Sequence, residues 1–215
     1  MNLDIKGVII SNDEGWIYDL FGIEYTSPAK IVNALREANG EDVDIDINSY
    51  GGDVFAGSEI YTAIRGYSGN VNIHIVGVAA SAASVIACAA HSDISPTAQM
   101  MVHNVSIARA CGDYHDMDKA SEMLQQANRA LAAAYTEKSG MTEKEVLDMM
   151  DVETWLTADD AVAYKLVDEI AEAKNTNQGA TVIGDRLAAS ASGMLPGAVI
   201  DKMQAKRQSL IDYFN

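Results

Sequence analysis

The sequence predicts an α/β fold in which strands alternate with helices. Two successive segments carry the same strand–turn–helix pattern. An alternating strand at residues 43–48 leads through a glycine-rich turn into a helix that contains Ile60 and Ile64. An apolar, β-branched strand at residues 71–76 then leads through small residues into a second helix at 85–90. Since 48% of the 215 residues are hydrophobic, the chain can form one sizeable core.

The first forty residues predict a short β region followed by a helix. Residues 5–11 read as a strand, and a turn at 12–15 lets Trp16–Tyr18 pair back as a short hairpin. Ser27 is a typical N-cap, with Pro28 at the first helical position. Asn39-Gly40 is a typical end for the helix that follows.

The second half of the chain is predicted to be mostly helical. Residues 94–103 form a strand region broken at Ser95-Pro96, and residues 114–139 form a long helix with Leu124 and Leu131 on one apolar face. Gly140 ends that helix. Shorter helices begin at Thr142 and Thr157, and Val167 to Ile170 forms a last short strand.

The texture of the sequence changes after residue 170. Residues 171–215 contain five basic and four acidic residues, whereas the rest of the chain is strongly acidic. The segments 175–179 and 188–197 are polar or rich in small residues, which is typical of linkers. We therefore predict a domain over residues 1–170 and a C-terminal linker and tail over 171–215, with a short helix within 198–214.

Composition excludes several classes of function. A formal net charge of −16 argues against a nucleic-acid partner, because phosphate binding needs clustered Lys and Arg. Two cysteines, Cys88 and Cys111, make neither a disulfide framework nor a metal pattern. The sequence has no signal peptide and no apolar run of the ~18 residues that a membrane span needs, so a cytoplasmic protein is expected. No nucleotide-binding or zinc-protease motif is present, and no cofactor or metal is expected.

Ser81 is the candidate nucleophile. It lies where a strand is followed by a helix N-terminus, and the unpaired N–H groups there can stabilise an oxyanion. A serine nucleophile also needs a base. Of the four histidines (His74, His91, His103 and His115), His103 ends a strand, where active-site side chains lie in open α/β sheets. The motif G-x-S-x-G is absent, which argues against an α/β-hydrolase.

Four motifs together resemble those of ClpP-type serine peptidases. They are, in the order and approximate spacing of that family, Asn-Ser-Tyr-Gly-Gly at 48–52, Gly-Val-Ala-Ala-Ser-Ala-Ala at 77–83, Met-Val-His at 101–103 and Trp-Leu-Thr-Ala-Asp-Asp-Ala at 155–161. The resemblance covers about residues 5–170. The variants at 51–57 and 153–158 look most like the ClpP-related head-maturation proteases of tailed phages and prophages.

The resemblance implies a ClpP/crotonase-type fold of repeated ββα units, with residues 1–170 as the peptidase domain. Residues 104–118 and the long helix would form a handle between rings of a homo-oligomer. Carried over position by position, Ser81 is the nucleophile, His103 the general base and Glu153 the acid. The backbone N–H groups of Gly52 and Ala82 would be the oxyanion donors.

Three departures from the family pattern affect these expectations. Tyr50 replaces the family's usual proline, Glu153 stands where aspartate is usual, and the first strand begins too early for long axial loops, so an AAA+ unfoldase partner is not favoured. Asp151 is the alternative acid. Both carboxylates are expected in an extended link in which residues two apart point the same way, and the register with Trp155 favours Glu153.

The expected function is an ATP-independent serine endopeptidase that acts on protein or peptide substrates, with phage capsid or scaffold proteins as partners. Localisation would be the bacterial host cytoplasm or the phage prohead. Three alternatives remain: a ClpP-type subunit fed by an AAA+ unfoldase, a crotonase-fold acyl-CoA enzyme that does not need the Ser81–His103 pair, and an inactive assembly protein.

Overall fold

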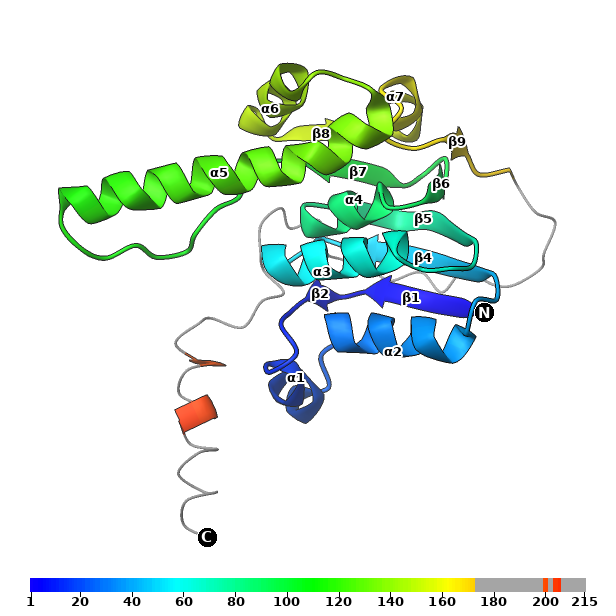
Figure 1. The fold of residues 1–215 in the computed structure, drawn as a ribbon, viewed down its shortest axis with the longest axis horizontal. Helices are drawn as coiled ribbons and strands as arrows, with labels where there is room; N and C mark the ends of the chain where they lie inside the picture. Colours follow the sequence, from blue (N-terminus) through cyan, green and yellow to red (C-terminus); the bar gives the residue numbers. More distant parts are fainter. Residues whose placement is uncertain (173–198, 201–202, 206–215) are drawn as a thin grey trace, which may run out of the picture.

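The computed structural model describes residues 1–172, 199–200 and 203–205. Within them the chain forms a seven-stranded sheet, a separate two-stranded sheet and seven named helices (Figure 1). In chain order the elements are β1 (Asn2–Lys6), β2 (Val8–Ile9), α1 (Gly15–Phe21), β3 (Tyr25–Thr26), α2 (Pro28–Ala38), β4 (Val43–Ser49), α3 (Val54–Arg65), β5 (Val71–Ala80), α4 (Ala82–Ala87), β6 (His91–Ile94), β7 (Gln99–Val102), α5 (Tyr114–Ser139), α6 (Glu143–Asp151), β8 (Thr154–Leu156), α7 (Ala158–Ala163) and β9 (Glu169–Ile170).

The large sheet is built around β5. Its main order is β1-β4-β5-β6-β9, and all of these neighbours are parallel. The first half of β5 pairs with β6, and its last residues, Val78 to Ala80, pair with β7. β8 adds to β7 in the antiparallel direction. The expected α/β class is therefore confirmed, and the sheet is mainly parallel.

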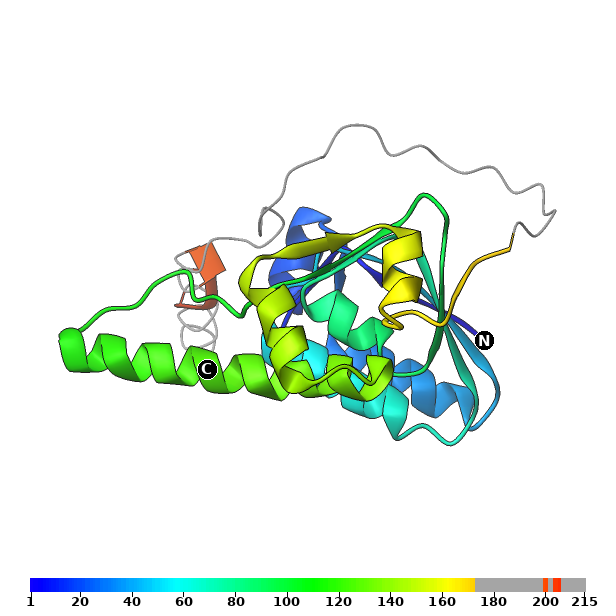
Figure 2. The same cartoon turned by 90° about the horizontal axis from the view of Figure 1, so that it is seen from above.

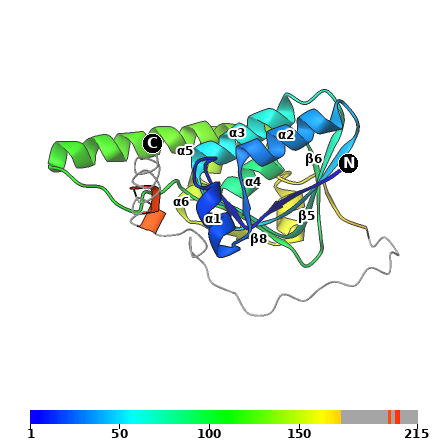
Figure 3. The same cartoon turned by 90° about the horizontal axis from the view of Figure 1, so that it is seen from below.

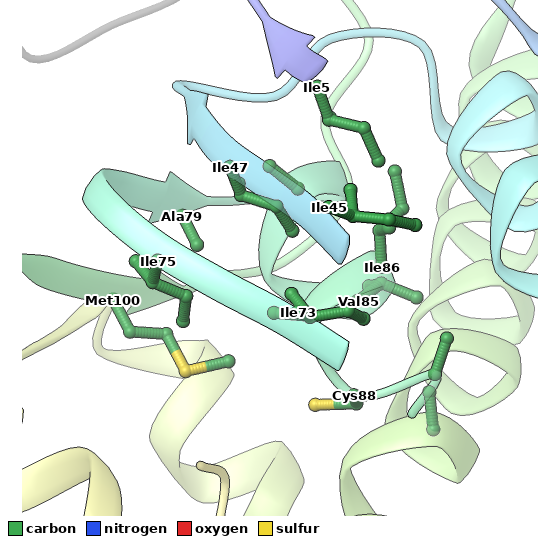
Figure 4. Close-up of a cluster of buried hydrophobic side chains, with 14 of the residues drawn as sticks. Ile5, Ile45, Ile47, Ile73, Ile75, Ala79, Val85, Ile86, Cys88 and Met100 are labelled. Atoms are coloured by element: carbon green, nitrogen blue, oxygen red, sulfur yellow. The ribbon is translucent and has the colours of Figure 1, made fainter. Parts of the chain in front are cut away.

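One face of the sheet carries the main hydrophobic core. Along β4 the buried residues alternate with partly exposed ones, so Ile45 and Ile47 face the core while Asp44 and Asp46 lie on the other face. Figure 4 shows how isoleucines from β1, β4 and β5 pack toward Val85 and Ile86 of α4. α2, α3 and α4 lie side by side along this face (Figures 1 and 3).

The long helix α5 packs on the domain at one end only. Its buried residues, among them Ala132 and Tyr135, all fall in its C-terminal part. The N-terminal part projects beyond the sheet, and the segment that follows β7 runs outward from the domain to the start of this helix (Figure 2). Apolar side chains on this projecting part are exposed: Tyr114 at 70%, Met123 at 55% and Met117 at 38%.

The predicted hairpin at Trp16–Tyr18 is wrong. These residues belong to helix α1, which ends at Gly22 in the left-handed conformation. Ile17 and Tyr18 are fully buried beside Ile10, and this burial outweighs the strand preference of the three large side chains. The predicted strand over residues 5–11 is also divided at Gly7, because β1 pairs with β4 whereas β2 pairs with β3.

Several helix boundaries agree with the sequence. The bounds of α5 are those predicted, and Thr142 and Thr157 both form capping boxes. Ser27 stands at the N-cap of α2 but its side chain makes no capping bond, and Asn12 Oδ1 accepts from Ala29 N at 2.8 Å in its place. The strand from Val71 is longer than predicted and continues to Ala80, and the last strand is reduced to Glu169–Ile170.

Most of the predicted linker and tail lies outside the described residues, including both expected linker segments. The described residues 199–200 and 203–205 are helical. Ile200, only 7% exposed, joins a second apolar cluster with Ile17 and Tyr18 of α1, and Met203 packs against the same cluster. In the described part of the chain, no helix combines the length and the apolar character that crossing a membrane requires.

Candidate active site

Ser81 occupies a strained turn between β5 and α4. Its backbone dihedrals are φ 56° and ψ −126°, a combination that a residue with a side chain seldom adopts. Such a conformation costs about 1–3 kcal/mol and clusters at functional sites. The Ser81 N–H donates to the carbonyl of Met101 on β7 at 3.0 Å, which ties the turn to the neighbouring strand. The half-buried hydroxyl is thereby presented at the carboxyl end of β5, as the sequence predicted.

His103 lies within hydrogen-bond distance of Ser81. It follows β7 directly, and its Nε2 is 2.8 Å from Ser81 Oγ. Burial lowers the pKa of His103 below its ordinary value, while the Glu153 carboxylate acts in the opposite direction. A lowered pKa favours the neutral imidazole, which can accept the serine proton, and the pair has the geometry of a nucleophile and its base.

Glu153 lies at the same end of the sheet, just before β8. It has a positive φ of 50°, and its Oε1 accepts from Trp155 Nε1 at 3.3 Å. Within the described residues its carboxylate makes no hydrogen bond to His103, so its influence on the imidazole acts through charge. Catalytic hydrogen bonds are often long in the unliganded state and tighten only with substrate.

Asp151 has a different environment. It is the last residue of α6, not part of an extended link as predicted, and its Oδ1 accepts from Asn104 Nδ2 at 2.7 Å. Strand alternation would have pointed the Asp151 and Glu153 carboxylates the same way. Because Asp151 belongs to α6 and Glu153 does not, the two carboxylates have different neighbours. Of the two, Glu153 acts on the pKa of His103.

Two candidate oxyanion donors come from the turns that meet at Ser81, since a Cβ on Gly51 would lie 2.7 Å from Ser81 Cβ. Gly52 lies in the turn after β4, at φ 152°, and the neighbouring bonds Ile9 N to Gly51 O and Asp53 N to Ile9 O leave its own N–H without an acceptor among the described residues. Ala82 is the first residue of α4, and its N–H likewise has no acceptor in that part of the chain. Unpaired donors beside a nucleophile can stabilise the oxyanion of a tetrahedral intermediate.

A cleft of about 850 Å³ runs past these groups. One wall is the glycine turn with Tyr50 and Phe55, and the other comes from α5 through residues such as Leu124 and Leu131. Phe55 is 79% exposed although it opens a helix. Phe55 and Trp155 were not predicted as site residues, and Leu124 and Leu131 were predicted only to lie on an apolar helix face. The sequence signal that could have placed Phe55 at the site is its position, because it is a large aromatic residue three positions after Gly52.

The other histidines lie elsewhere. His74 Nδ1 is 2.7 Å from Asp93 Oδ2 on the adjacent strand, and His91 begins β6, beyond the end of α4. His115 is exposed at the start of α5. In the range over which side chains are described, no group of three or more His, Cys, Asp or Glu side chains is arranged to hold a metal ion.

Comparison with known proteins identifies relatives. The family model described as Clp protease matches residues 24–174. The ATP-dependent Clp protease proteolytic subunit of Bacteroides fragilis is 31% identical over 134 residues, which cover 61% of this chain and 64% of that protein. ATP-dependent Clp protease proteolytic subunit 1 of Chlamydia felis is 27% identical over 173 residues, which cover 76% of this chain and 85% of that protein. The match thus spans less than two thirds of the length of the Bacteroides relative.

A solved structure has the same fold. A mutant of ClpP1 from Listeria monocytogenes superposes with a TM-score of 0.66 at 22% sequence identity, over 81% of this chain and 92% of that one. The expected ClpP-type fold is therefore confirmed. Residues 1–23, which include α1, lie outside the range that the family model matches.

The placement of Glu153 can be tested by an NMR pH titration of His103. We expect Glu153→Gln to lower the pKa of His103 further, because the carboxylate that favours the imidazolium is removed. Asp151→Asn is the matched control and should leave this pKa unchanged, since that carboxylate contacts Asn104. Equal His103 pKa values in the wild type and Glu153→Gln would contradict the placement.

Proposed function

The chain belongs to the Clp protease family, and on this basis we propose that it is a serine endopeptidase that cleaves protein or peptide substrates through an acyl-enzyme. The observation that carries the proposal is the 2.8 Å contact between Ser81 Oγ and His103 Nε2 at a strained turn with unpaired N–H groups beside it. No metal or cofactor is needed for this chemistry.

The reaction would follow from the positions of these groups. His103 Nε2 accepts the Ser81 proton while Oγ attacks the carbonyl carbon of the scissile peptide. The N–H groups of Gly52 and Ala82 hold the oxyanion that forms. The imidazolium then donates its proton to the leaving amine, and water hydrolyses the acyl-enzyme in the same way. Glu153 stabilises the imidazolium through its negative charge.

Two biological roles fit this chemistry. The first, maturation of phage capsid or scaffold proteins without ATP, rests on the motif variants at 51–57 and 153–158. The second is a proteolytic subunit that works with an AAA+ unfoldase, and it is favoured by the relatives, which are named as ATP-dependent Clp protease subunits. Capsid proteins encoded by neighbouring genes can be co-expressed with this protein and analysed by mass spectrometry. Discrete cleavage products are expected only if the protein matures phage capsids.

The other candidates differ in what Ser81 does. A crotonase-type acyl-CoA enzyme or an inactive assembly protein would not need a serine activated by histidine. A fluorophosphonate probe, which reacts with activated serine, therefore separates the peptidase from both.

Replacement of the nucleophile is the direct test. We expect Ser81→Ala to lower peptidase turnover by roughly 10⁴- to 10⁶-fold and to abolish fluorophosphonate labelling, because the attacking oxygen is removed. The control is Ser68→Ala, which replaces an exposed serine between α3 and β5. This variant should keep both the peptidase turnover and the fluorophosphonate labelling. Substantial turnover in Ser81→Ala would mean that another residue is the nucleophile.

The acid is tested by a second pair of variants. We expect Glu153→Gln to lower turnover by roughly 10²- to 10⁴-fold with little change in KM, because the imidazolium loses its stabilising charge. Asp151→Asn should retain most of the turnover. Near-normal turnover in the first variant with collapse in the second would transfer the role to Asp151.

We also propose that the protein is a homo-oligomer, in which the projecting part of α5 is covered by another copy. The exposed Tyr114, Met117 and Met123 on that part form an apolar surface that favours burial.

Light scattering at micromolar concentration tests this proposal. We expect a mass several times the 23.0 kDa of one chain, and Met123→Lys should reduce it, since a charge would then lie within the contact. A wild-type protein that scatters as a single chain would refute the proposal.

A further inference from the structure

A chain of two buried hydroxyl groups runs from the long helix α5 to the backbone of Ser81. The Ser81 carbonyl accepts from Ser84 Oγ at 2.6 Å, in addition to the N–H groups of Ser84 at 2.9 Å and Val85 at 3.3 Å. The two N–H bonds belong to the first turn of any helix, whereas the hydroxyl bond is specific to a serine three residues after the nucleophile.

Tyr135 of α5 completes the chain. Its hydroxyl lies 2.7 Å from Ser84 Oγ, and the two residues are 2% and 0% exposed. A serine hydroxyl has one hydrogen, and that of Ser84 goes to the Ser81 carbonyl, so the Tyr135 hydroxyl must be the donor to Ser84 Oγ. Burial raises the pKa of Tyr135 well above its ordinary value, so the hydroxyl keeps the hydrogen that this direction requires.

The carbonyl held in this way shares a peptide group with one of the oxyanion donors. The C=O of Ser81 and the N–H of Ala82 lie in one plane and point in opposite directions, because the peptide bond is planar and trans. A carbonyl directed into the protein toward Ser84 therefore directs the Ala82 N–H toward the cleft. Any rotation of this peptide plane would move the N–H away from the oxyanion.

The plane needs such support because Ser81 is strained. At φ 56° and ψ −126° the backbone would lower its free energy by rotating to more common dihedral angles unless neighbouring groups hold it. The Met101 carbonyl holds the N–H of Ser81 on one side, and Ser84 holds its carbonyl on the other.

We propose that Ser84 and Tyr135 are positioning residues that fix the Ser81–Ala82 peptide plane and thereby aim the Ala82 N–H at the oxyanion. This role rests on the proposed peptidase function. Tyr135 is among the residues that line the cleft, but it is only 2% exposed, and its hydroxyl is directed to Ser84 Oγ inside the protein. Tyr135 acts only through Ser84, and it connects the anchored end of α5 to the catalytic turn.

The role is tested with Tyr135→Phe and Ser84→Ala, which remove one hydroxyl each and leave the surrounding shape nearly unchanged. Loss of an oxyanion donor costs roughly 10²- to 10³-fold in kcat, and a donor that is present but less well aimed should cost less, roughly 10-fold. For both variants we expect kcat to fall roughly 10-fold, with KM within about twofold of the wild-type value.

A peptide boronic acid distinguishes aim from general stability. The boron forms a bond to Ser81 Oγ without a leaving group, the serine proton passes to His103, and the tetrahedral adduct places an oxygen at the oxyanion donors. Its inhibition constant should rise by the same factor as kcat/KM falls, whereas the constant for a product peptide should not change. The double variant should be no worse than Ser84→Ala alone, because Tyr135 acts through Ser84.

Tyr67→Phe is the matched control. It removes a tyrosine hydroxyl that donates to the Glu41 carbonyl at 2.7 Å. Tyr67 is not among the residues that line the cleft, so this variant should leave kcat and the boronate constant unchanged. Thermal unfolding of every variant gives the folded fraction, to which each rate is normalised.

Unchanged kcat and boronate affinity in Ser84→Ala and Tyr135→Phe, with an active wild type, would overturn the positioning role alone. Strictly additive losses in the double variant would overturn the action of Tyr135 through Ser84. A wild type without turnover or boronate binding would overturn the proposed function, and this role with it.

Discussion

The backbone conformation of Ser81 is the constraint on which the rest of the site depends. A residue with a positive φ directly after β5 turns the chain sharply into α4, and its hydroxyl reaches His103 Nε2 at the carboxyl end of the strand. Gly51 lies against this turn. A side chain is not tolerated at this position, because a Cβ there would stand 2.7 Å from both Ser81 Cβ and the Ala80 carbonyl oxygen. The strain at one residue therefore explains the small residues around it.

The parallel sheet supplies the framework that holds the turn. β5 is long enough to pair with β6 along its first half and with β7 at its end. This divided pairing brings the residue after β7, His103, to the residue after β5, Ser81. The turn after β4 carries Gly52 to the same edge, because parallel strands present their carboxyl ends together.

Helix α5 serves two parts of the molecule. Its C-terminal end is buried against α4 and contacts Ser84, in the first turn of that helix, through Tyr135, while Leu124 and Leu131 line the cleft. Its projecting end exposes apolar side chains. One helix thus joins the wall of the cleft, the hydroxyl contact to Ser84 and an exposed apolar surface.

Elements with local signals could be predicted from the sequence alone. The alternation of Val43, Ile45 and Ile47, the periodic apolar face of α5 and the capping residues Thr142 and Thr157 each act within a few residues, so their elements were predictable. The motifs around Ser81 and His103 also pointed to the pair that the structure brings together.

Features that depend on partners distant in the chain could not be predicted from local patterns. Trp16 to Tyr18 became helical because burial beside Ile10, not local preference, sets their conformation. Alternation left Asp151 and Glu153 equivalent, and they were separated because α6 extends to Asp151 and turns its carboxylate to Asn104. The bond between Ser84 and Tyr135 spans 51 positions, and no local pattern encodes a contact that exists only once α5 has packed on α4.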